Sequence, residues 1–352
     1  MLHTILALPN DVLRNALVPF LDLECLIGLD AATLCKQDRP RLLDTIFCGT
    51  LLPEPEIDYH PELVTWLRMR GMFVKCLNFL HEGACDDELL FAVPVLQRAM
   101  GFQLPEHSNI TNTALQTVFA SFHTLQHVQF TGCEVDDETI EALANNHPNL
   151  LGFRAIRCEF ISDYSMMLLA ENCLQLSRVQ LDECPYVSNK TVDALAEHCV
   201  LVEFSLVGCV DIETDSLVRL LKKCGPVLQS LDLSNIPELE GELFALAQHC
   251  PMVDHLYLND CEDINEEALR AVLQACQELE ALDMRGSKLG RETLECISTH
   301  ISPALMDLRL YHCPEMTDER LVPLLERVEH LNALYLNDSP ITNASLLALA
   351  SL

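Results

Sequence analysis

Apolar residues recur in a fixed pattern over most of the chain. A nine-residue unit, apolar at positions one, four and six and often ending in cysteine, repeats every 25 to 27 residues. The eleven units begin at Val74, Ala99, Leu125, Leu150, Leu176, Leu201, Leu228, Val253, Leu279, Leu305 and Leu331. Apolar positions two residues apart, such as Leu256 and Leu258, are typical of a strand with one buried face. Each unit therefore predicts one strand.

A helix is expected after each strand. Turns such as Val135-Asp136-Asp137 place Asx or Thr side chains where they can cap a helix N-terminus. Apolar residues three and four apart then follow, as in 139–144, 191–196 and 268–273, which indicates helices with one buried face. A second column of cysteines closes these helices at Cys173, Cys199, Cys224, Cys250 and Cys276. Such units predict a solenoid, because no single unit can bury its own apolar face.

The pattern L-x-x-L-x-L-x-x-C, followed by an I-T-D-like turn and a helix, resembles the cysteine-containing class of leucine-rich repeats. Ile236, Ser287 and Ser339 replace the cysteine of the ninth position, and the first two units are degenerate. Elsewhere that cysteine recurs in register, at Cys133, Cys158, Cys184, Cys209, Cys261 and Cys313. The resemblance implies an α/β leucine-rich-repeat solenoid, a horseshoe whose strands line the concave surface.

The segment before the repeats lacks the nine-residue pattern, and its apolar residues have helical spacing. Its order L-P-x-x-V-L, F-L-D-L-x-x-L and C-K resembles an F-box, a small helical module that docks on a Skp-type adaptor of a cullin-RING ubiquitin ligase. An F-box usually has a tryptophan soon after the C-K pair, whereas Arg39-Pro40 stands there and the single tryptophan, Trp66, lies outside the module. An apolar ridge on a helical module fits a partner groove. The resemblance implies that the adaptor contacts Leu8, Pro9, Val12, Leu13, Phe20 and Leu21.

These patterns divide the chain into three parts. We expect an F-box-like helical module at 1–48, a helical linker or cap at 49–73, and the repeat solenoid at 74–352. The alternative for the first part is a helical cap that only covers the open edge of the first repeat.

Charge and cysteine content narrow the class of protein. The chain has 22 basic and 53 acidic residues, and its net charge of −31 disfavours nucleic acid and anionic membrane surfaces as partners. No run approaches the roughly 18 apolar residues of a membrane-spanning helix, and no secretion signal is recognisable. The 17 cysteines are an odd number, so we expect reduced, buried thiols and an intracellular protein, cytoplasmic or nuclear and not secreted.

The concave surface is the expected binding site. Positions three, five, seven and eight of each unit face it, and tyrosine and arginine are the side chains most enriched at binding hot spots. The competing interpretation is a solvated sheet whose charges pair with one another. A smaller cluster, Arg154, Arg157 and Arg178, is expected to pair with Asp182, Glu183 or Glu203, and the alternative is that it contacts an anionic group of a partner. For a protein partner we predict contacts with His255, Tyr257, Arg285, Asp307, Arg309, Tyr311, His312 and Tyr335.

Metal and enzyme chemistry are disfavoured. The pairs His198-Cys199, His249-Cys250 and His312-Cys313 invite a zinc interpretation, but no C-x-x-C spacing occurs in the chain. Motifs of nucleotide-binding loops, nucleophile elbows and zinc proteases are also missing. We expect no catalytic residue, metal or cofactor.

The function that follows is protein recognition. The F-box resemblance implies a substrate-recognition subunit of an SCF-type ubiquitin ligase, whose target, of unknown identity, binds the concave face. The alternative is a leucine-rich-repeat scaffold or regulatory protein without a ligase link.

Overall fold

The computed structural model describes most of the chain, in two compact units. One unit extends to Phe153 and includes Cys158–Phe160, and the other comprises Arg154–Arg157 and the chain from Ile161 onward. The described residues are 21, 23–32, 51–52, 56–79, 83–106, 108–209, 212–236, 238–261, 263–287, 289–311, 315–328, 330–337 and 339–350.

Strands and helices alternate in the first unit. Its strands β1 to β4 are parallel and pair in chain order. In chain order the elements are α3 (Leu23–Ala32), β1 (Ile57–Asp58), α5 (Pro61–Arg70), β2 (Cys76–Asn78), α6 (Asp86–Leu96), β3 (Gly101–Leu104), α7 (Asn112–Phe119), β4 (His127–Thr131) and α8 (Asp137–Asn146). Strand β5 (Gly152–Ile156) begins in this unit and ends in the second.

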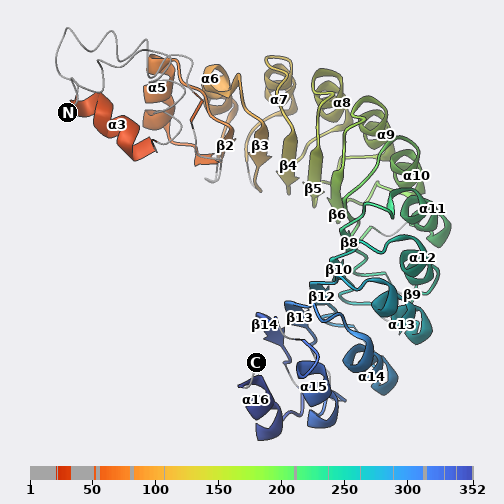
Figure 1. Cartoon of the computed structure of the whole chain (residues 1–352). Coiled ribbons are helices and arrows are strands. Elements are labelled where there is room, and N and C mark those ends of the chain that lie inside the picture. The colour runs from red at the N-terminus through yellow and green to blue at the C-terminus, as the bar shows by residue number, and fades with distance from the viewer. Residues whose placement is uncertain are drawn as a thin grey trace. The chain divides into compact units, whose positions relative to one another are not determined.

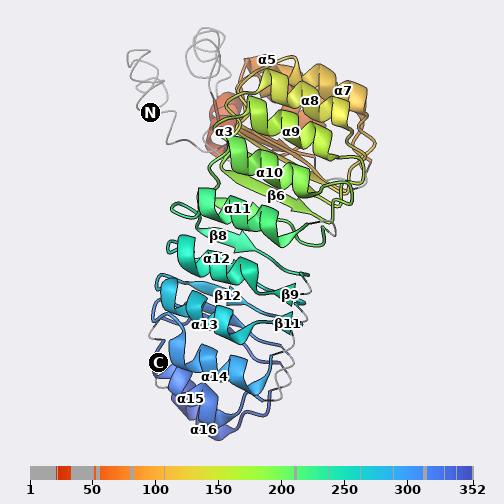
Figure 2. The same ribbon diagram turned by 90° about the vertical axis from the view of Figure 1, so that its right-hand side faces the viewer.

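The second unit continues the alternation, with its helices stacked in chain order (Figure 2). Its strands line the inner side of the ribbon and the helices lie on the outer side (Figure 1). The inner strands are β6 (Arg178–Asp182), β7 (Glu203–Ser205), β8 (Ser230–Asp232), β10 (His255–Tyr257), β12 (Ala281–Asp283), β13 (Asp307–Arg309) and β14 (Ala333–Tyr335). The helices are α9 (Asp163–Asn172), α10 (Asn189–His198), α11 (Thr214–Cys224), α12 (Gly241–His249), α13 (Glu266–Ala275), α14 (Arg291–His300), α15 (Asp318–Leu325) and α16 (Asn343–Leu349). A separate pair, β9 (Glu238–Leu239) and β11 (Asp263–Ile264), joins two turns.

The predicted strand and helix of each repeat are confirmed where the structure describes them. The apolar positions four and six are buried in the first ten repeats, as shown by Leu256 and Leu258, which are both 0% exposed, whereas Leu334 and Leu336 of the last repeat are half-buried. The predicted helical segments 139–144, 191–196 and 268–273 lie within α8, α10 and α13. The capping prediction holds at Asp136, whose side chain accepts from the Thr139 amide at 2.9 Å, but Thr317 makes no such bond.

The cysteine at position nine is a hydrogen-bond donor as well as a small core residue. The Cys261 thiol donates to the carbonyl of Leu233, the sixth position of the preceding repeat, at 3.5 Å. Ser287, one repeat later, donates to the equivalent carbonyl of Leu258 at 2.6 Å. Serine replaces cysteine there because both side chains are small and can donate.

Aspartates at helix N-termini connect neighbouring repeats. Asp163 at the start of α9 accepts from the Ser188 amide at 2.8 Å, the Ser188 hydroxyl at 2.6 Å and the Thr191 hydroxyl at 2.7 Å. These bonds lower the pKa of Asp163, although burial opposes them. Asp86 likewise accepts hydrogen bonds from the amide and the hydroxyl of Thr111. The capping side chain of one repeat is thus fixed by the repeat before it.

An ionic clamp joins α3 to α5. Asp30 Oδ2 accepts from Trp66 Nε1 at 2.9 Å and from Arg70 Nε and Nη2 at 3.0 and 2.5 Å. The Asp30 and Arg70 side chains are 7% and 11% exposed, and Leu26 on α3 is fully buried. Helix α3 of the predicted F-box-like module therefore packs against α5 of the predicted linker or cap.

Candidate protein-binding surface

The parallel register arranges side chains of the second unit in rows across the strands. Residues at position five follow one another as Asp232, Tyr257, Asp283, Arg309 and Tyr335, each paired in register with the next. Because neighbouring parallel strands are about 4.8 Å apart, residues of one row are spaced for direct contact.

Two arginines on this surface are held by aspartates of their own repeats. Arg285 Nε lies 2.9 Å from both carboxylate oxygens of Asp283, and Arg309 Nη2 donates to Asp307 Oδ2 at 2.6 Å. Asp283 is only 3% exposed and also lies 3.8 Å from Arg309. The hydrogen bonds with these aspartates raise the pKa of both guanidinium groups. The arginines are thereby fixed in orientation rather than free to move.

Each of these arginines also lies over a tyrosine at the same position of the next repeat. The guanidinium carbon of Arg285 lies 5.8 Å from the Tyr311 ring centre, and that of Arg309 lies 5.2 Å from the Tyr335 ring centre. The two tyrosine rings are 6.3 Å apart and inclined at 66°. Arg285, Tyr311, Arg309 and Tyr335 form a contiguous group that we call the arginine–tyrosine ladder.

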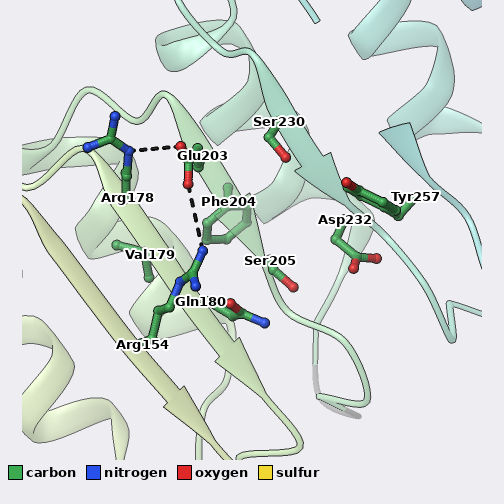
Figure 3. A pocket seen from close by; sticks show the side chains of 10 residues that line it. All are labelled: Arg154, Arg178, Val179, Gln180, Glu203, Phe204, Ser205, Ser230, Asp232 and Tyr257. Carbon is green, nitrogen blue, oxygen red and sulfur yellow. Dashed lines mark hydrogen bonds and ion pairs between the residues drawn. The ribbon is translucent and has the colours of Figure 1, made fainter. Parts of the chain in front are cut away.

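Tyr257 lies apart from the ladder, between two hollows in the strand surface. The β10–β13 hollow, of about 210 Å³, has Ala281 in a row between the larger His255 and Asp307. The β5–β10 hollow, of about 250 Å³, is shown in Figure 3. It is lined by Arg154, Arg178, Val179, Gln180, Glu203, Phe204, Ser205, Ser230, Asp232 and Tyr257.

The β5–β10 hollow has an ion-paired edge on β5, β6 and β7. Arg178 Nε donates to Glu203 Oε1 at 2.8 Å, whereas Arg154 Nη2 is 4.0 Å from the other Glu203 oxygen (Figure 3). Two of the three arginines, Arg154 and Arg178, thus pair with Glu203 as expected. Asp182, another expected partner, instead accepts from the Ser205 hydroxyl at 2.5 Å and from Gln180.

The opposite side of the hollow has a half-buried carboxylate. Asp232 Oδ1 accepts from the amide and hydroxyl of Ser234 at 2.9 and 2.5 Å. Burial, with the nearby carboxylates of Asp182 and Asp283, outweighs these bonds and raises the pKa of Asp232 to about 6. Burial and the charge of Asp232 also raise the pKa of Tyr257.

The structure places most of the predicted target-binding residues on this one surface. Tyr257, Asp307 and Arg309 line the β10–β13 hollow with His255, whose Nδ1 lies 2.6 Å from Asp254 Oδ1. His312 is outside the described residues. The charges of Arg285 and Arg309 do pair internally, as the competing interpretation expected. That pairing leaves Tyr335 41% exposed beside them.

The predicted adaptor-binding residues cannot be placed in the same way. Leu8, Pro9, Val12, Leu13 and Phe20 lie outside the described residues, and Leu21 is described only as partly buried. Their role stays a prediction.

Sequence reasoning missed Asp232, although the signal was present. Asp232 stands at position five of the unit that begins at Leu228, in the row of Tyr257. The Asp30 clamp had no sequence signal, because its partners are 36 and 40 residues away.

The described residues show no metal centre or membrane span. Within them, no group of three or more His, Cys, Asp or Glu side chains is placed to hold a metal ion. No helix in the same part of the chain is long and apolar enough to cross a bilayer. The fourteen described cysteines are free thiols, and all are buried except Cys25, Cys85 and Cys209.

Comparison with known proteins agrees with the repeat architecture. A leucine-rich-repeat family model matches residues 123–144, and no curated protein matches the sequence. A chain of the yeast Rad7–Elc1 complex has a similar fold, with a TM-score of 0.51 and 17% identity over 78% of this chain and 75% of that chain. TLR13, from its complex with ssRNA13, gives a TM-score of 0.48 and 13% identity over 85% of this chain and 48% of that chain. The repeat register, the parallel strands and the similarity to the Rad7–Elc1 chain identify the fold as an α/β leucine-rich-repeat solenoid.

Proposed function

We propose that this chain is the substrate-recognition subunit of an SCF-type cullin-RING ubiquitin ligase, in the cytoplasm or nucleus. In this proposal residues 1–48 bind a Skp-type adaptor and the strand surface of the second unit holds the target protein. The chain binds rather than catalyses, and other subunits transfer ubiquitin to the target for proteasomal degradation.

The arginine–tyrosine ladder is the observation that carries the recognition part. The mutual contacts of its side chains already order them, so these side chains would lose little conformational entropy when a partner binds. Tyrosine and arginine in such a fixed group are typical of binding hot spots.

The adaptor part is supported by the F-box resemblance of residues 8 to 43. Rad7, which has a similar fold, was crystallised in a complex with Elc1. We propose that this chain, too, assembles with a second protein, and that its N-terminal module provides the contact.

Calorimetry with a Skp-type adaptor tests the ligase assignment. The full chain should bind, and the variants Leu8→Asp, Val12→Asp and Phe20→Asp should lose binding because each places a charge in the apolar ridge. Leu174→Asp serves as the control, since Leu174 is 64% exposed on the second unit. Failure of the unmodified, folded chain to bind any adaptor would contradict the assignment.

The clamp between Asp30, Trp66 and Arg70 favours a second candidate function. Helix α3 is tied to α5 by a buried ion pair, as expected of an N-terminal cap. In this alternative the protein is a recognition scaffold without a ligase link. A folded chain that binds a target but no adaptor would establish it.

A further inference from the structure

The β5–β10 hollow has opposite charges at its two ends. Arg154 on β5 and Asp232 on β8 both occupy position five, and β6 and β7 lie between them. Three strand spacings of about 4.8 Å separate these two residues by roughly 14 Å. The hollow therefore presents a cationic group and an anionic group at a defined separation.

The intervening side chains leave this space open. Gln180 and Ser205, at position five of β6 and β7, turn their polar groups to Asp182. Ser230 is a small residue on the wall beside Asp232. Small and already hydrogen-bonded groups thus form the floor, while the larger Arg154 and Tyr257 mark its two ends (Figure 3).

The Arg154 guanidinium can still bind an anionic group of a partner. Its side chain is 51% exposed, and its ion pair with Glu203 has a length of 4.0 Å. Glu203 is more closely engaged by Arg178, at 2.8 Å. A carboxylate of a partner could approach the Arg154 guanidinium with bidentate geometry, which the long contact with Glu203 does not use.

Asp232 is suited to a cation. Its Oδ1 is occupied by Ser234, and within the described part of the chain its Oδ2 has no hydrogen-bond partner. The Tyr257 ring lines the same hollow and gives a flat aromatic surface that attracts cations. A lysine or arginine side chain would pair with Asp232 in a half-buried place, where such a contact is stronger than in open solvent.

An extended peptide has the matching dimensions. It advances about 3.3 Å per residue, and its side chains alternate between two faces. Residues i and i+4 therefore point the same way and lie about 13 Å apart, close to the separation of the two charged groups.

We infer that the β5–β10 hollow binds an extended segment of a protein partner that carries an acidic side chain against Arg154 and, four residues away, a basic side chain against Asp232 and Tyr257. This inference rests on the proposed function only in taking the strand surface as the site of protein recognition. It adds the charge pattern by which the partner is selected. A polyanion such as a nucleic acid fits poorly, because Asp232 and Glu203 line the same hollow.

A displayed library of random 12-residue peptides, selected on the full chain, tests the inference. Enriched binders should carry an acidic and a basic residue at positions i and i+4, with three residues between them. Asp232→Asn and Arg154→Gln should each weaken these binders by about tenfold or more, since each removes one partner of a charged contact. Glu171→Gln, an exposed carboxylate on α9, is the matched control and should leave them unchanged.

A change of specificity gives a second, positive readout. Asp232→Lys should enrich peptides with two acidic residues at the i and i+4 positions, because the anionic end of the hollow has become cationic. Circular dichroism confirms that this variant is folded.

The outcomes separate the inference from the proposed function. Binders that are lost with Tyr257→Ala but show no charge pattern would overturn the inference and leave recognition by the strand surface standing. A library without binders, or with binders insensitive to all of these changes, would overturn both.

Discussion

Removing the Asp30 carboxylate should release α3 from the first unit. In the folded chain this group accepts hydrogen bonds from Trp66 Nε1 and from Arg70 Nε and Nη2. Asp30→Ala leaves the Arg70 guanidinium, 11% exposed, without its counter-charge. Breaking a buried ion pair in this way costs about 3 to 5 kcal/mol.

The cost of removing Asp30 is best measured as local opening of α3. Helix α3 can detach while the rest of the unit stays folded, because few of its side chains are buried. Among those that the structure describes, only Leu26 and Asp30 are. Hydrogen exchange of the α3 amides is therefore the appropriate assay. A loss of 3 to 5 kcal/mol should accelerate their exchange between about a hundredfold and a few thousandfold, up to the unprotected rate.

Two further variants make the test specific. Glu24→Ala removes an exposed carboxylate from the same helix and should change exchange little. Asp30→Ala combined with Arg70→Met should restore much of the protection, since no buried charge is left unpaired. If α3 exchanged in Asp30→Ala as it does in Glu24→Ala, the clamp would not hold the helix and the reasoning would be refuted.

Three other predictions concern the repeats. Asp163→Ala should lower the free energy of unfolding in urea by about 2 to 3 kcal/mol, because three hydrogen bonds to a carboxylate are lost, whereas Glu171→Ala should change it little. Burial lowers the pKa of His147 to about 4. The unfolded chain then binds a proton that the folded chain rejects, so stability should fall by up to about 3 kcal/mol as the pH drops from about 6.5 to 4, and an unchanged pH slope in His147→Gln would contradict this. Burial raises the pKa of Cys199 to about 12, so native protein at pH 8 should be alkylated at the exposed Cys25 and not at Cys199, as mass spectrometry of the labelled peptides would show.

The repeat period made most of the fold predictable. Burial of positions four and six follows from strand alternation, and the rows of the strand surface follow from the constant register between repeats. The meeting of Arg309 with Tyr335 could be derived in this way, since both stand at position five of successive units.

Other features depend on contacts that no local pattern encodes. Strand β1 precedes the first predicted unit and pairs with β2, the strand of that unit. A short segment outside the repeat pattern thus adds one more strand to the sheet. The β5–β10 hollow is lined by Gln180, Ser205 and Ser230 from three different strands, and its shape needed the folded structure. The three-part division of the chain and the adaptor-binding residues stay predictions.

Photo-crosslinking tests the central claim, recognition of protein by the strand surface, most directly. A crosslinking amino acid is placed in the full chain either at Tyr257, on the strand surface, or at Tyr164, which is 56% exposed on α9. The account predicts that, in cells, position 257 crosslinks to a discrete protein and position 164 does not. A target captured from position 164 alone would contradict it.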